Sequence, residues 1–181
     1  MPSGGDRRLF WIVLASVIGL DVVTKLAAVA TLSRFPLPVL GDWVTLQLVY
    51  NPGAAFGIHV GGASRWVFTG LALIALVVLG LMVRQTRPEQ RLRLMALGLV
   101  CGGAIGNLID RIRNARGVVD FIDVGVGAYR WPTFNVADIA VTSGAVVLAF
   151  ILWGEGREPE RQRSEADHGG TTDPANASST S

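Results

Sequence analysis

The chain has 181 residues, of which half are hydrophobic and only 17% are charged, with a formal net charge of +2 and a mean hydropathy of +0.44. A soluble domain usually carries about a quarter charged residues, so this composition indicates one domain that lies in a bilayer. The arginines are scattered near the ends of apolar segments, a pattern typical of membrane orientation that argues against nucleic-acid binding. The single cysteine, Cys101, excludes an intramolecular disulfide and a metal site built from several cysteines.

Four apolar segments are long enough to cross the hydrocarbon core, which takes roughly 20 residues. They cover residues 9–30, 66–83, 92–112 and 136–153. An even number of crossings places both termini on one side of the membrane. Nine arginines lie in the terminal segments and the second loop, against five in the two other loops, so we expect both termini in the cytoplasm.

The first apolar segment also has the three parts of a cleavable signal peptide, with two arginines before an apolar core and small residues, Ala28 and Ala30, at its end. Asp21 and Lys25 lie where that interpretation requires small neutral residues, and removing the segment would leave an odd number of crossings. We therefore expect the segment to remain as a transmembrane helix.

The predicted fold class is an all-α membrane protein, with four transmembrane helices and a small β-cradle on the outer face. Residues 43–50 are rich in β-branched and aromatic residues and are followed by Asn51-Pro52-Gly53, which predicts a strand that ends in a turn. Residues 124–131 are the candidate partner strand. We expect residues 1–8 to be a cytoplasmic N-terminus, 9–153 the membrane domain and 154–181 a disordered cytoplasmic tail, because the tail is too polar to bury a core.

Polar residues within the apolar segments gather at the ends that should face outward. An ionisable group at the edge of hydrocarbon loses hydration and persists only with a partner or a water-filled cavity, so it is a candidate for function. Asp120 and Asp138 flank the start of the fourth segment. If they meet in one cavity they can share a proton, which suits acid and base chemistry on one water.

Other catalytic groups are scarce in the sequence. The two histidines, His59 in an outer loop and His168 in the tail, poorly supply a Ser/His hydrolase or a histidine metal site. The single lysine, Lys25, has no serine on the same face of its helix, which argues against a Ser/Lys protease. The residues therefore favour an intramembrane aspartyl protease that needs no metal.

Two polar features have alternative interpretations. Asp21 and Lys25 are four residues apart, so they either form an ion pair or act separately, with Lys25 extending toward lipid headgroups. Asn107, Asp110 and Arg111 either form a structural network between helices or belong to the site. Glycines recur every four residues in the third apolar segment, and we expect them to let a neighbouring helix approach closely.

Five short motifs occur in order at residues 21–25 (DVVTK), 51–57 (NPGAAFG), 103–111 (GAIGNLIDR), 118–121 (VVDF) and 134–138 (FNVAD). Together they resemble the motifs of bacterial lipoprotein signal peptidase, also called signal peptidase II. The resemblance covers about residues 9–153 and leaves out the polar tail.

This resemblance implies cleavage of prolipoproteins just before a cysteine that carries a diacylglyceryl group, with Asp120 and Asp138 as the catalytic pair. The residues that it assigns to substrate binding or to support of the site are Asp21, Lys25, Asn51, Gly53, Phe56, Asn107, Asp110, Arg111 and Asn135. The implied partners are the prolipoprotein and membrane lipid, with no cofactor and no obligate protein partner. The implied location is the bacterial inner membrane, with the site toward the outer face.

Two alternatives come from other functional classes. One is a small transporter or channel subunit with an acidic ion path, and the other is a structural four-helix scaffold. The acidic residues gather at one face and do not continue toward the cytoplasm, which disfavours an ion path. A structural scaffold would tolerate asparagine at Asp120 and Asp138.

Overall fold

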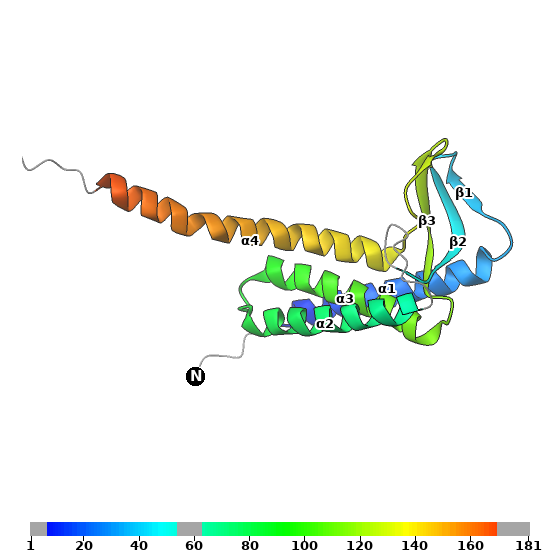
Figure 1. Ribbon diagram of the computed structural model, residues 1–181, viewed down its shortest axis with the longest axis horizontal. Helices are drawn as coiled ribbons and strands as arrows, with labels where there is room; N and C mark the ends of the chain where they lie inside the picture. Colours follow the sequence, from blue (N-terminus) through cyan, green and yellow to red (C-terminus); the bar gives the residue numbers. More distant parts are fainter. Residues whose placement is uncertain (1–6, 54–62, 170–181) are drawn as a thin grey trace, which may run out of the picture.

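The computed structural model describes residues 7–53 and 63–169, with four long helices and a small sheet that lies across one end of them (Figure 1). The helices are α1 (Arg8–Thr31), α2 (Ser64–Gln85), α3 (Arg91–Arg113) and α4 (Val136–Gly169). The strands are β1 (Leu37–Leu40), β2 (Val44–Asn51), β3 (Val118–Val126) and β4 (Tyr129–Arg130).

All four helices contain a stretch that is long and apolar enough to cross a membrane. These stretches are Arg8–Thr31, Ser64–Gln85, Arg91–Arg113 and Val136–Glu155, close to the four predicted segments. Large apolar side chains on α2, such as Trp66, Ile74 and Val77, are 63–65% exposed. Apolar surface of this extent is stable in hydrocarbon and not in water. The predicted four-helix membrane fold with a small sheet is confirmed.

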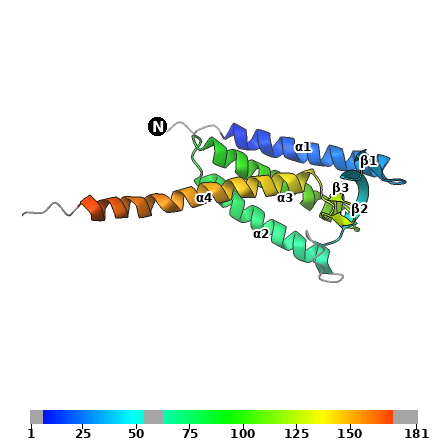
Figure 2. The same ribbon diagram turned by 90° about the horizontal axis from the view of Figure 1, so that it is seen from above.

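Helix α3 lies at the centre, with α1 and α2 on opposite sides of it and α4 packed along it (Figure 2). A Cβ atom added at Gly102 would lie 2.8 Å from Cβ of Val17 in α1. One added at Gly103 would collide with the carbonyl oxygen of Ala137 in α4. Helices α1 and α4 therefore both touch the α3 backbone, as the glycine spacing predicts.

The sheet has the order β1-β2-β3-β4, with antiparallel neighbours. The predicted strand at residues 43–50 is confirmed as β2. The partner predicted at 124–131 is wrong in its start, because β3 begins at Val118, and the predicted range holds only the end of β3, a turn and β4. Asp120 and Asp123 interrupt the apolar pattern of β3, although both are buried. The register places Val49 opposite Asp120 and Asn51 opposite Val118, so the end of β2 lies beside Asp120.

The structure corrects the prediction of disorder from residue 154, because α4 continues to Gly169 (Figure 1). Once a helix is nucleated, each added residue gains a hydrogen bond at little further cost. Residues 154–169 contain four glutamates and three arginines, which favour helix by their intrinsic propensity, whereas Gly154, Gly156 and Pro159 do not. Residues 170–181 lie outside the described part of the chain.

Candidate active site

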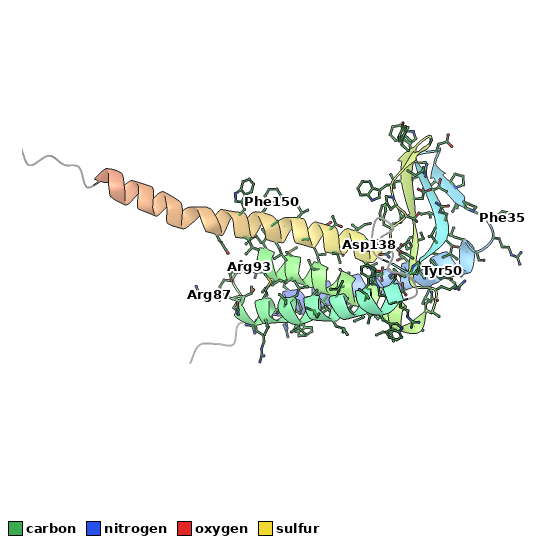
Figure 3. All side chains as sticks on the ribbon, in the orientation of Figure 1. Phe35, Tyr50, Arg87, Arg93, Asp138 and Phe150 are labelled. Atoms are coloured by element: carbon green, nitrogen blue, oxygen red, sulfur yellow. The ribbon has the colours of Figure 1, made fainter. Side chains whose placement is uncertain are left out.

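A cavity of about 670 Å³ opens where the ends of β2 and β3 meet α3 and the start of α4. Five of the predicted site residues line it: Asn51, Asn107, Arg111, Asp120 and Asp138. Figure 3 shows Asp138 and Tyr50 near this junction, whereas Arg87 and Arg93 lie at the opposite end of the helices. The fold thus brings together polar residues from four elements that are far apart in the sequence.

Asp120 lies in β3, and its side chain is only 2% exposed. Asn51 Nδ2 donates a hydrogen bond to Asp120 Oδ2 at 3.0 Å, and Asn135 Nδ2 donates to Oδ1 at 2.7 Å. Burial and the nearby charge of Asp138 raise the pKa of Asp120 to about 6, while the two amide hydrogen bonds act in the opposite direction. This carboxyl group therefore holds a proton at a pH where an exposed aspartate is ionised.

Asp138 lies in the first turn of α4 and forms a capping box with Asn135. Asp138 Oδ2 accepts the backbone N–H of Asn135 at 3.2 Å, and Asn135 Oδ1 accepts the backbone N–H of Asp138 at 2.9 Å. Asn107 Nδ2 donates to Asp138 Oδ1 at 2.8 Å. The N-terminus of α4 and these two N–H donors all face the Asp138 carboxyl group. The Asn-x-x-Asp spacing is a sequence signal for this contact, which was not among the predictions.

Lys25 connects α1 to the same network. Its Nζ lies 2.8 Å from Asp21 Oδ2 and 2.9 Å from Asp110 Oδ2, and it donates to Asn107 Oδ1 at 2.9 Å. The Lys25 side chain is only 4% exposed, so the ion pair is found and Lys25 does not extend toward headgroups. Asn135 Nδ2 also donates to Asn107 Oδ1, at 3.1 Å. Because both groups donate to the amide oxygen of Asn107, its amide nitrogen faces Asp138.

Asp21 and Asp110 also hold the backbone on either side of the cavity. Asp21 Oδ1 accepts the N–H of Ala137, the residue before Asp138, at 3.0 Å. Asp110 Oδ2 accepts the N–H of Val119, the residue before Asp120, at 3.0 Å. The buried ion cluster therefore positions the two segments that carry the cavity aspartates.

Arg111 and Gly53 lie next to the C-terminal end of β2. Arg111 Nη1 donates to the carbonyl oxygen of Asn107 at 3.3 Å, and Nη2 donates to that of Gly53 at 3.4 Å. The N–H of Gly53 donates to Asn51 Oδ1 at 3.0 Å, which fixes the orientation of that amide. Phe56, the remaining predicted site residue, lies outside the described residues.

The apolar and hydroxyl-bearing walls of the cavity were not predicted from the sequence. The wall residues include Tyr50, Trp131, Phe134, Ile139 and Thr142. Their types are common in any membrane helix or surface strand, so composition gives no signal for them. They become recognisable only when the sheet is folded over the start of α4.

Known proteins resemble this chain in both sequence and fold. A family profile described as "Signal peptidase (SPase) II" matches residues 13–153. "Lipoprotein signal peptidase" of Burkholderia mallei (strain SAVP1) is 40% identical over 151 residues, which cover 82% of this chain and 90% of that protein. The protein of the same name from Paraburkholderia phymatum matches with the same identity and coverage.

Two solved structures, each described as a "Bacterial membrane enzyme structure", superpose with TM-scores of 0.71 and 0.69 at 28% and 30% identity. The alignments cover 81% and 79% of this chain and 88% and 91% of those chains. The family profile includes both cavity aspartates, the sheet and the membrane-crossing part of α4. The chain therefore belongs to the signal peptidase II family, and it is a multi-pass peptidase of the bacterial membrane.

Proposed function

We propose that this chain is an aspartic endopeptidase that removes signal peptides from prolipoproteins by cutting just before the diacylglyceryl-modified cysteine. The observation that carries the proposal is that Asp120 and Asp138 line one cavity and are both bonded to Asn135. Membership of the signal peptidase II family suggests the substrate class. Paired carboxylates in different surroundings are suited to divide acid and base roles.

In the proposed mechanism Asp138 is the base and Asp120 is the acid. Asp138 takes a proton from water as the water oxygen attacks the scissile carbonyl carbon, and Asp120 gives its proton to the carbonyl oxygen. The tetrahedral intermediate then collapses as Asp138 protonates the leaving amine and one intermediate hydroxyl returns a proton to Asp120. Both carboxyl groups end in their starting states, so the cycle needs no further proton donor.

The position of the cavity suits a lipid-linked substrate. Two of its lining residues, Tyr50 and Asp138, lie at the sheet end of the helices rather than midway along them (Figure 3). Its apolar wall, with Trp131, Phe134 and Ile139, would accept acyl chains while the polar end holds the peptide bond. The arginine asymmetry supports an outward orientation of this end, where exported precursors arrive.

The function is tested with purified protein and two precursors of identical sequence, one with a diacylglyceryl group on the cysteine and one unmodified. We expect kcat/KM to be at least about a hundredfold higher for the lipidated precursor, because each buried methylene contributes roughly 0.8 kcal/mol and a few suffice. Both must be compared in the same bilayer at matched concentration. Equal rates would contradict lipid recognition, and no cleavage of either would contradict the proposed function.

The proposed roles also predict a pH dependence. The active form holds one proton on the aspartate pair, and the proton leaves Asp120 as the pH rises through its pKa of about 6. We therefore expect kcat/KM to fall above about pH 6. A bound precursor excludes more water and disfavours ionisation further, so kcat should decline at a higher pH than kcat/KM. An increase of kcat/KM between pH 6 and 8 would contradict Asp120 as the acid.

A further inference from the structure

The turn between α3 and β3, residues 114–117, lies against the end of β2, where Asn51 reaches Asp120. We propose that Arg116 is a positioning residue of the active site, which clamps Tyr50 and thereby holds the Asn51 amide against Asp120. Arg116 itself is exposed and lies outside the residues that line the cavity. The inference deepens the proposed function and rests on it, since it concerns the acid of that reaction.

The turn is held by its own hydrogen bonds and packs on the backbone of Asn51. The N–H of Arg116 donates to Asn114 Oδ1, and the N–H of Gly117 donates to the Asn114 carbonyl oxygen, both at 3.1 Å. Gly117 has a φ of 104°, a conformation that favours glycine. A Cβ atom there would collide with the carbonyl oxygen of Asn51 and lie 2.7 Å from Cα of Pro52. Because the turn touches this backbone directly, it sets where β2 ends.

Arg116 adds a two-point contact to the neighbouring side chain. Its Cζ atom lies 3.6 Å from the centroid of the Tyr50 ring, and its Nη2 donates to the Tyr50 hydroxyl oxygen at 2.7 Å. A stacked guanidinium that also donates a hydrogen bond fixes both the position and the tilt of the ring. Tyr50 directly precedes Asn51, so fixing its ring limits twisting at the end of the strand.

The consequence for Asp120 follows from the hydrogen bond that Asn51 donates to it at 3.0 Å. This bond favours the ionised carboxylate and lowers the pKa of Asp120. If the end of β2 twists and the bond lengthens, the pKa of Asp120 rises. Within residues 7–53 and 63–169, the other charged groups that act on Asp120 are Asp138 of α4, Lys25 of α1 and Arg111 of α3, and substitution of Arg116 leaves all three in place.

The test compares Arg116→Ala with Arg113→Ala. Arg113 is an exposed arginine at the end of α3, so its loss removes the same charge without touching Tyr50. For Arg116→Ala we expect the falling limb of the pH profile of kcat/KM to move to higher pH by about half a unit. We also expect kcat/KM at pH 5 to fall about fivefold, because Asn51 then positions the acid less well. The kcat/KM of Arg113→Ala should stay within about twofold of that of the unchanged protein. Arg116→Lys should give an intermediate shift, because lysine keeps the charge but not the planar fork.

Equal shifts in the two alanine variants, or no shift in either, would overturn the positioning role. If the unchanged protein does not cleave a lipidated precursor, the proposed function fails but the clamp is still testable. Titration of the Asp120 carboxyl carbon by ¹³C NMR should then show a higher midpoint in Arg116→Ala than in Arg113→Ala. Equal midpoints would overturn the clamp as well.

Discussion

Replacement of either Asp120 or Asp138 by asparagine should lower kcat for a lipidated precursor by about 10⁴-fold, because each carboxyl group moves a proton in the proposed reaction. An amide of the same shape can neither take the proton from water nor give one to the carbonyl oxygen. Since both variants break one shared unit, the double variant should be little worse than either single variant.

These variants should remain folded. Among the described residues, the Asp120 carboxyl group accepts hydrogen bonds from Asn51 and Asn135, and that of Asp138 accepts them from Asn107 and the backbone of Asn135. An asparagine keeps one acceptor and places its NH₂ group opposite a donor, which costs about 1–3 kcal/mol, offset in part by removal of a buried charge. Thermal unfolding in detergent should therefore show only a modest loss of stability.

Asp42→Asn is the matched control for this prediction. It makes the same chemical change at an exposed carboxylate in the β1–β2 turn, away from the cavity. Activity of this variant should match that of the unchanged protein within about twofold. Near-normal kcat in Asp120→Asn or Asp138→Asn would remove that residue from the catalytic pair, and the aspartyl mechanism would fail with it.

The membrane-crossing helices were predictable from sequence because the thickness of the hydrocarbon core imposes a local rule on length and composition. The start of β3 was not, because its buried polar residues are stabilised by distant partners. Asp123, for example, accepts a hydrogen bond from Gln47 at 2.8 Å and lies 2.8 Å from Arg130 Nη2. A polar residue with such partners is as buried as an apolar one, but a pattern of hydrophobic alternation cannot show that.

The same distinction explains how far the site could be predicted. Asp138 and Asn135 are three residues apart, so their contact is encoded in a local motif. Lys25 and Asn107 are 82 positions apart and meet only because α1 and α3 pack through glycines. Their identities pointed to a site, but the order of contacts from Lys25 through Asn107 to Asp138 is a product of the fold.

Lys25→Met should be the most destabilising single substitution in this network. It leaves Asp21, which is fully buried, and the partly buried Asp110 without their shared cation. Removing one partner of a buried ion pair typically costs about 3–5 kcal/mol, because the remaining charge is neither hydrated nor paired. We expect the thermal unfolding temperature in detergent to fall by roughly 10 °C. Arg113→Met, which removes an exposed cation from the end of α3, should change it by less than about 2 °C.

Adding Asp21→Asn to Lys25→Met separates loss of charge balance from loss of packing. The double variant removes one of the two carboxylates that Lys25→Met leaves unpaired. It should recover part of the lost stability, since Asp21 and Lys25 interact directly. It should recover little activity, because the amide oxygen of Asn107 keeps the hydrogen bond from Asn135 but loses the one from Lys25, so the amide nitrogen is held less firmly against Asp138. A double variant less stable than Lys25→Met would mean that methionine fits the site poorly and that the ion cluster is not the source of the loss. Recovery of stability together with activity would mean that Lys25 acts only through charge balance and has no part in orienting Asn107.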